Sequence, residues 1–167
     1  EDTAITEKEF GPQYDIHGEG IDLIFPHHEA EIAQMESISG KKPLVRYWLH
    51  TGFLKTNKQK MSKSLKNFST IKELLKDYSK ETIRYFFALT HYRKPLDFSK
   101  ETLENAKSSY ERLKNICSEI QNDNSINEKY LKEYEKEMDD DFNTPKALQI
   151  LWKLVRDEKA KGKYQTI

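Results

Sequence analysis

Residues 14–31 decide the fold class of this chain and read Tyr-Asp-Ile-His-Gly-Glu-Gly-Ile-Asp-Leu-Ile-Phe-Pro-His-His-Glu-Ala-Glu. Tyr14–His17 predicts a short strand, and Gly18 and Gly20 after it predict a turn in which the backbone closely approaches a ligand. Pro26 is tolerated in the first turn of a helix, so a helix is expected to start there and to stop at Gly40. A strand, a turn and a helix in this order indicate an α/β domain.

The flanking segments extend this pattern in both directions. Residues near Glu1 read as strand or loop. Leu44–Leu49 is rich in β-branched and aromatic residues and predicts a second strand, whereas residues 52–66 predict a lysine-rich loop.

Helix signals dominate the rest of the chain. Thr70 and Glu73 form a capping box, and Ser79 and Ser99 each precede a helical pattern. The helix after Ser99 repeats apolar residues at alternating spacings of three and four, which is typical of a bundle seam: Leu103, Ala106, Tyr110, Leu113, Cys117 and Ile120. Asn143 precedes a last helix, which the acidic residues 139–141 are expected to cap. The predicted fold is therefore an α/β domain over residues 1–98 followed by an α-helical bundle over residues 99–167.

Composition excludes several classes of protein. The 167 residues carry 28 Lys and Arg against 28 Asp and Glu, but residues 1–40 have a net charge of −9 and residues 41–80 a net charge of +9. No apolar run approaches the roughly 18 residues of a membrane span, and no secretory signal opens the chain. The lone Cys117 excludes an internal disulfide and fits a reducing compartment, so a cytoplasmic location is expected. Because the chain starts with Glu1 rather than Met, we expect a piece of a larger protein.

His27 and Glu31 are the first candidate site. They lie four residues apart in the predicted helix and therefore project from one face. An imidazole and a carboxylate at this spacing can chelate Zn²⁺, and the same spacing is typical of an exposed ion pair. Spacing alone leaves both interpretations open. His28 points about a quarter-turn away and is assigned no role.

Lys60-Met61-Ser62-Lys63-Ser64 is the second candidate site. Two ammonium groups three residues apart, flanked by hydroxyls, can neutralise and hydrogen-bond a triphosphate. The alternative is a solvated lysine-rich loop.

Both candidate sites resemble one family. Residues 17–31 resemble the H-G-G-G-x-D-x-x-F-P-H-H-E-N-E block of cysteinyl-tRNA synthetases, and residues 60–64 match K-M-S-K-S, the second signature of class I aminoacyl-tRNA synthetases. Residues 90–99 and 139–145 resemble two further stretches of that family. The resemblance implies that residues 1–98 are the second half of a Rossmann-type class I catalytic domain and that residues 99–167 begin a tRNA-binding helical bundle.

The resemblance also implies a zinc site. In that family, the residues at the positions of His27 and Glu31 bind one Zn²⁺ per subunit, which grips the substrate thiol. A third family ligand is a Cys, and its position here is occupied by Asp2, a harder ligand than a thiolate. A fourth ligand, an N-terminal Cys, lies outside this chain.

The nucleotide site is implied in the same way. His17, Gly18, Gly20 and Asp22 would line the adenylate pocket, although from spacing alone His17 could equally be a strand-end histidine and Asp22 a turn cap. Lys60, Ser62, Lys63 and Ser64 would bind ATP, with Mg²⁺, and Lys60 and Lys63 would be catalytic. Glu19 and Lys66 stand at positions where the family has glycine, and Ala30 stands where it has Asn.

The implied function is that of a cysteine–tRNA ligase, with L-cysteine, ATP and tRNA(Cys) as partners. Such a fragment, which lacks the family's H-I-G-H-type motif, is expected to be inactive by itself. Two alternatives share part of this sequence pattern: a paralogous ATP-dependent ligase that couples cysteine to an amino sugar, and a catalytically inactive RNA-binding relative.

Overall fold

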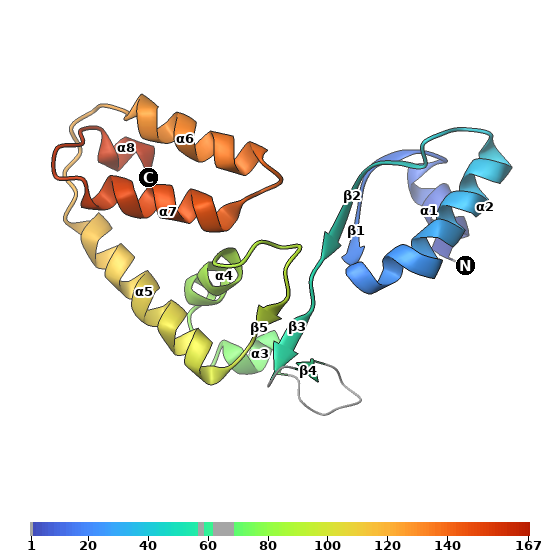
Figure 1. The fold of residues 1–167 in the computed structure, drawn as a ribbon, viewed down its shortest axis with the longest axis horizontal. Coiled ribbons are helices and arrows are strands. Elements are labelled where there is room, and N and C mark those ends of the chain that lie inside the picture. Colours follow the sequence, from blue (N-terminus) through green and yellow to red (C-terminus); the bar gives the residue numbers. More distant parts are fainter. Residues whose placement is uncertain (1, 57–58, 62–68) are drawn as a thin grey trace. The chain divides into compact units, whose positions relative to one another are not determined.

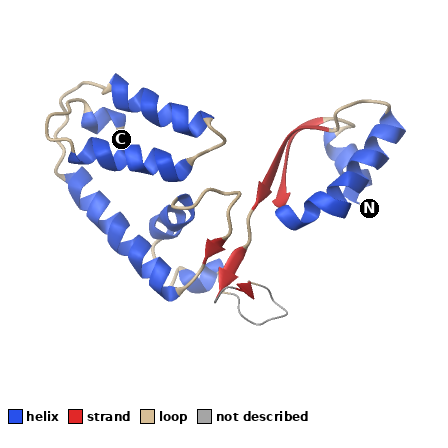
Figure 2. Cartoon of the chain, viewed as in Figure 1, coloured by secondary structure: helices blue, strands red, loops and turns tan. Residues whose placement is uncertain are grey.

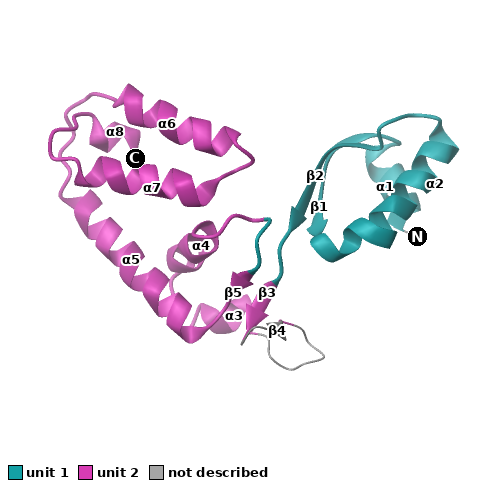
Figure 3. Cartoon of the chain, in the orientation of Figure 1, with its two compact units in different colours: residues 1–53, 93–95 teal, residues 54–92, 96–167 magenta. Residues whose placement is uncertain are grey.

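The computed structural model describes residues 2–56, 59–61 and 69–167, and contacts divide the chain into two compact units (Figures 1 and 3). Unit 1 comprises residues 1–53 and 93–95, and unit 2 comprises residues 54–92 and 96–167. This division by packing falls inside the predicted first domain, because residues 54–92 share a core with the helices that follow. The domain boundary predicted after residue 98 stays a prediction.

A parallel two-stranded sheet forms the centre of unit 1 (Figure 2). Strand β1 (Tyr14–Gly20) pairs in parallel with strand β2 (Val45–Thr51), and helix α2 (Glu29–Ser39) connects them, which is the βαβ arrangement that parallel pairing requires. The predicted turn after His17 is wrong, because the strand continues to Gly20. Ladder partners at Leu49, His50 and Thr51 keep this segment extended.

Helix α2 starts later than predicted. Phe25 is extended (φ −135°, ψ 133°) and interrupts the helical turns over residues 21–28, so the regular helix starts at Glu29. It stops at Gly40, as predicted, because Gly40 adopts the left-handed conformation (φ 67°). Its buried Met35 packs with Leu44 and Val45 to form the small core of unit 1.

The chain opens with a helix instead of the predicted strand or loop. Helix α1 (Asp2–Phe10) has an acidic residue in its first turn and Lys8 in its last turn, which suits the helix dipole. Its Thr3 hydroxyl donates to Oε1 of Gln34 at 2.9 Å, so the helix is tied to α2.

Unit 2 contains short strands where residues 52–66 were predicted to be a loop. Strand β3 (Leu54–Thr56) pairs antiparallel with β4 (Gln59–Lys60) and in parallel with β5 (Leu96–Asp97). The prediction failed because the β5 partner lies some forty residues further along the chain, where local patterning carries no information about it.

Helices make up the rest of unit 2: α3 (Ile71–Leu74), α4 (Lys80–Ala88), α5 (Lys100–Ser118), α6 (Glu128–Asp139), α7 (Thr144–Arg156) and α8 (Lys163–Thr166). The core joins α4, α5 and α7 through Phe86, Leu103 and Val155. The predicted seam of α5 is confirmed, since Leu103, Ala106 and Leu113 are buried and the other seam residues pack against the same core. Within the described residues, no helix is both long and apolar enough to cross a membrane.

The predicted N-terminal caps are confirmed at three helices. Thr70 and Glu73 form the capping box of α3, and the hydroxyls of Ser79 and Ser99 accept hydrogen bonds from backbone amides of α4 and α5.

The capping of α7 by the acidic residues 139–141 stays a prediction, while the side chain of its N-cap residue Asn143 makes no capping hydrogen bond. Asp139 ends α6, and Oδ1 of Asp141 accepts a hydrogen bond from the Tyr92 hydroxyl at 2.6 Å.

Candidate functional site

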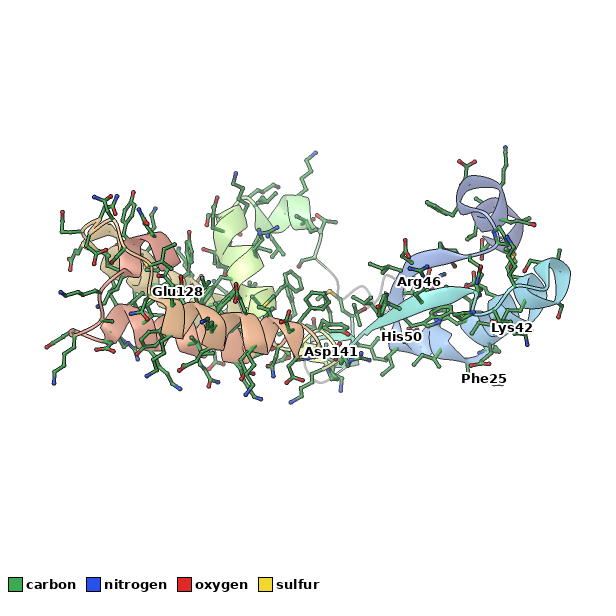
Figure 4. The ribbon with its side chains drawn as sticks, turned by 90° about the horizontal axis from the view of Figure 1, so that it is seen from above. Phe25, Lys42, Arg46, His50, Glu128 and Asp141 are labelled. Carbon is green, nitrogen blue, oxygen red and sulfur yellow. The ribbon has the colours of Figure 1, made fainter. Side chains whose placement is uncertain are left out.

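Four imidazoles and a buried carboxylate gather in unit 1. Strand β1 carries His17, the turn before α2 carries His27 and His28, α2 carries Glu31, and β2 carries His50 (labelled in Figure 4). The parallel pairing places His17 beside Trp48, and their rings stack with centroids 4.8 Å apart. The sheet and the start of α2 therefore build this site together.

Glu31 lies at the centre of the group. Its side chain is only 8% exposed, Oε1 lies 3.7 Å from Nε2 of His27, and Oε2 lies 3.8 Å from Nε2 of His17. Oε2 is buried and has no hydrogen-bond partner among the described residues. A buried carboxylate oxygen without a hydrogen bond is costly, so a bound cation would stabilise this position.

The spacings support that interpretation. Hydrogen-bonded nitrogen and oxygen atoms lie about 2.7–3.2 Å apart, whereas two ligands of one tetrahedral Zn²⁺, with bonds of about 2.0–2.1 Å, lie about 3.3 Å apart. The distances of 3.7 and 3.8 Å at Glu31 are too long for hydrogen bonds and near the spacing of two ligands. The residues present therefore fit a metal ion.

Asp2, His27 and Glu31, the set predicted from the sequence, are brought together. Nε2 of His27 lies 3.9 Å from Oδ2 of Asp2 and 3.7 Å from Oε1 of Glu31. Their assignment as zinc ligands stays a prediction. A second, overlapping set consists of His17, His28 and Glu31, whose ligand atoms all lie within 4.8 Å of one another.

His17 is held by a tyrosine. The Tyr14 hydroxyl lies 2.6 Å from Nδ1 of His17, and burial, assisted by the charges of Glu31 and Glu19, raises the pKa of Tyr14 to about 12. The phenol therefore stays protonated at neutral pH, and its hydrogen bond with Nδ1 turns Nε2 of His17 toward Glu31.

Sequence reasoning missed His28. Its side chain is 3% exposed, Nδ1 lies 2.9 Å from Nε2 of His50, and Nε2 lies 3.2 Å from Oε2 of Glu19. Burial lowers the pKa of His50, and the neighbouring His28, Arg93 and His17 lower it further. The one signal in the sequence was Glu19 itself, a carboxylate at a position where the resembled family has glycine.

The glycines of the predicted adenylate pocket differ in their surroundings. A Cβ built at Gly20 would lie 2.6 Å from Oδ1 of Asp22, so the Asp22 carboxylate occupies the space that a side chain would need. A Cβ at Gly18 would make only ordinary contacts, at 3.8 Å and beyond. Because this oxygen is the end of an exposed side chain that can turn away, the contact by itself does not require glycine at position 20.

The second candidate site is only partly described. The backbone of Lys60 pairs with Lys55, and the Met61 amide donates to the Leu54 carbonyl at 2.8 Å. Ser62, Lys63 and Ser64 lie outside the described residues, so their predicted binding of ATP stays a prediction.

Comparison with known proteins agrees with this fold. Residues 1–108 match the family model described as "tRNA synthetases class I (C) catalytic domain", and residues 133–161 match a DALR domain. The chain therefore belongs to the family of class I tRNA synthetases.

The particular relatives carry one name. The chain is 58% identical over 122 residues to the cysteine--tRNA ligase of Thermoplasma acidophilum, covering 73% of this chain and 27% of that protein. It is 46% identical over 158 residues to that of Legionella pneumophila strain Corby, covering 93% of this chain and 34% of that protein. The chain thus spans about a third of the length of the curated relatives it matches.

Solved structures confirm the predicted fold class. Methionyl-tRNA synthetase of Mycobacterium tuberculosis, bound by methionyl-adenylate, matches with a TM-score of 0.65 and 18% identity over 96% of this chain and 40% of that chain. LeuRS of Agrobacterium radiobacter K84, in a ternary complex with tRNA and LeuAMS, matches with a TM-score of 0.68 and 14% identity over 91% of this chain and 24% of that chain. At these identities the likeness concerns the fold.

Proposed function

We propose that this chain forms part of a cysteine–tRNA ligase, which activates L-cysteine with ATP and Mg²⁺ to cysteinyl-adenylate and passes the cysteinyl group to tRNA(Cys). The observation that carries the proposal is the 46% identity to the Legionella pneumophila cysteine--tRNA ligase over 93% of the chain. The lone Cys117 suits a reducing compartment, and we place the protein in the cytoplasm.

His27, Glu31 and Asp2 would hold one Zn²⁺ per subunit. The buried, unpartnered Oε2 of Glu31 supports a cation at this position. Bound zinc supplies a Lewis acid that binds a thiolate strongly and a neutral hydroxyl weakly. Cysteine and serine are then distinguished by the type of bond rather than by size, which by itself gives only about 10–200-fold discrimination.

The protein's own groups would orient the rest of the substrate. Asp22 would offer a carboxylate to the substrate ammonium or the nucleotide. His17 and Gly18 would line the adenylate pocket from β1. Lys60 and Lys63, with the hydroxyls of Ser62 and Ser64, would stabilise the charge that develops on pyrophosphate as it leaves.

The proposed zinc site is tested by measuring the zinc content of variants and by spectroscopy of the cobalt-substituted protein. We expect His27→Ala and Glu31→Ala to lose the metal, and Glu29→Ala, which removes an exposed carboxylate of the same helical turn, to keep it. In Co²⁺-loaded protein, L-cysteine is expected to add a sulfur-to-metal charge-transfer band, and L-serine is not. Unchanged zinc content in both ligand variants would refute the site.

The acceptor is tested in the protein that carries this chain. Cysteine-dependent ATP–pyrophosphate exchange followed by transfer of cysteine to tRNA supports the ligase. Transfer to an amino sugar would favour the paralogous ligase, and tRNA binding without pyrophosphate exchange would favour an inactive RNA-binding relative.

A further inference from the structure

Three helices of unit 2 surround an open hollow with a volume of about 900 Å³. Helix α5 contributes Arg112, α6 contributes Tyr130, and α7 contributes the neighbouring Trp152, Lys153 and Arg156. Its volume lies in the range of about 300–1,000 Å³ that is usual for small-molecule sites. The function proposed above uses none of these residues.

The basic side chains of this hollow lack acidic partners. The ion pairs of Lys and Arg among the described residues lie elsewhere, so Arg112, Lys153 and Arg156 make none. One helical turn away from Arg112, α5 carries only uncharged residues: Ser108, Ser109, Asn115 and Ile116. The guanidinium of Arg112 is therefore not neutralised from its own helix.

Asp157 is the one acidic residue among the described residues that line the hollow, and its carboxylate is already engaged. Oδ2 accepts a hydrogen bond from the Tyr130 hydroxyl at 3.0 Å, and Oδ1 accepts one from the backbone amide of Lys159 at 3.0 Å. Three positive side chains against this single carboxylate leave a net charge of +2 at the hollow.

Trp152 gathers both guanidinium groups. Cζ of Arg156 lies 4.4 Å from the centroid of its ring and Cζ of Arg112 lies 6.0 Å from it, within the reach of cation–π attraction. The indole itself is fixed, because Nε1 donates to the hydroxyl of the buried Tyr85 at 3.0 Å. Two like charges held near one ring repel each other, and an anion bound by both would remove this repulsion.

Helix-dipole compensation accounts for only part of this arrangement. Lys153 and Arg156 lie in the last turn of α7, where positive charge suits the negative end of the helix. Arg112 lies well inside α5 (Lys100–Ser118), where the helix dipole offers no such stabilisation. The convergence of Arg112 with Arg156 on Trp152 therefore needs another explanation.

We propose that this hollow binds the phosphate group of a small phosphomonoester, with Arg112 and Arg156 as its principal contacts. The planar guanidinium fork matches two phosphate oxygens, and Lys153 adds a third cation. A phosphomonoester carries a charge of about −1.5 to −2 at neutral pH, which balances the net charge of +2. The carboxylate of Asp157 disfavours an extended polyanion such as RNA, whereas Trp152 and Tyr130 suit an aromatic group on the ester.

The test is nitrogen NMR of the tryptophan-labelled chain, which contains only Trp48 and Trp152. Phenyl phosphate and inorganic phosphate are titrated at pH 7.5, with sodium chloride keeping the ionic strength constant. We expect both to shift the indole signal of Trp152 to saturation, and phenyl phosphate to do so at the lower concentration. The signal of Trp48 in unit 1 is expected to stay in place.

Four variants identify the groups responsible. Arg112→Gln and Arg156→Gln should each weaken phenyl phosphate binding about 10–100-fold, because each removes a charge-assisted hydrogen bond. Arg156→Lys keeps the charge without the fork and should weaken it less than Arg156→Gln. Arg84→Gln removes an exposed guanidinium of α4 outside the hollow and should bind as the wild type. Arg112→Gln remains informative if Arg156→Gln disturbs the end of α7.

Several outcomes would overturn the proposal. These are a Trp152 signal that responds equally to chloride, a shift of Trp48 without one of Trp152, and unchanged affinity in both Arg→Gln variants. A short single-stranded RNA that shifts Trp152 at lower concentrations than phenyl phosphate would also overturn it, in favour of a nucleic-acid surface. None of these measurements depends on cysteine, zinc or ligase activity, so their result leaves the proposed function untouched.

Discussion

Glu31→Gln replaces the central carboxylate of the site by an amide of the same shape. In the absence of metal, the substitution removes a buried negative charge whose Oε2 has no hydrogen bond among the described residues, which relieves about 1–3 kcal/mol. It also removes a negative charge from the first turn of α2, which costs about 0.3–1 kcal/mol. The metal-free variant is therefore expected to be as stable as the wild type, or up to about 3 kcal/mol more stable.

In the presence of zinc, the wild type is expected to be more stable than Glu31→Gln. At a free Zn²⁺ concentration 100-fold above the dissociation constant, binding to the folded wild type adds about 2.7 kcal/mol to its free energy of unfolding. The variant, which lacks a ligand, is expected to gain little. Zinc should thus stabilise the wild type by about 2–3 kcal/mol more than Glu31→Gln.

Urea denaturation measures this difference. Trp48 stacks on His17 of the site. Its fluorescence reports the unfolding of unit 1 once Trp152 of unit 2 is replaced by Phe. Glu29→Gln serves as the control, because it removes an exposed carboxylate from the same helical turn and should keep the full zinc effect. An equal zinc-dependent gain in wild type and Glu31→Gln would refute the assignment of Glu31 as a ligand.

Three further predictions concern stability. Folding raises the pKa of Tyr14 from 10.0 to about 12, so the unfolded chain loses this proton at lower pH than the folded chain. The free energy of unfolding should therefore fall between pH 10 and about pH 12. In urea denaturation at alkaline pH, Tyr14→Phe should abolish this fall. Because Phe86 is only 2% exposed, Phe86→Ala should lower the free energy of unfolding of unit 2, measured by urea denaturation, by about 3–5 kcal/mol. Phe87→Ala should lower it clearly less, because Phe87 is 41% exposed. Equal losses would contradict the assigned core. Thr70→Ala removes the α3 capping box and should lower the stability by about 0.5–2 kcal/mol, as measured by thermal denaturation. Thr70→Ser keeps the hydroxyl and should retain most of that stability.

Helix termini and the bundle seam were predictable because they depend on near neighbours. Thr70 and Glu73 are three residues apart and satisfy each other's backbone amides wherever the helix lies. The seam of α5, with Leu103 and Leu113 buried, follows from the period of the helix alone.

The strands were harder to predict because they depend on partners that are distant in the sequence. Leu54 pairs with Leu96, and a strand this short is stable only in the presence of that distant partner. The segment from Gly18 to Gly20 was likewise predicted as a turn, and only its ladder with β2 keeps it extended.

The chain's own sequence determined the α/β-then-helical order, the helix caps and the residue types of the site, because each depends on contacts within a few residues. Only the tertiary structure decided which of these side chains meet. His27 and Glu31 lie close through the local backbone, but Asp2 joins them from α1, and Glu19 and His50 enclose His28 from two strands. Asp141 likewise accepts a hydrogen bond from the distant Tyr92. Such contacts join residues up to 49 positions apart, and they form only when the sheet and helices pack, so no local pattern encodes them.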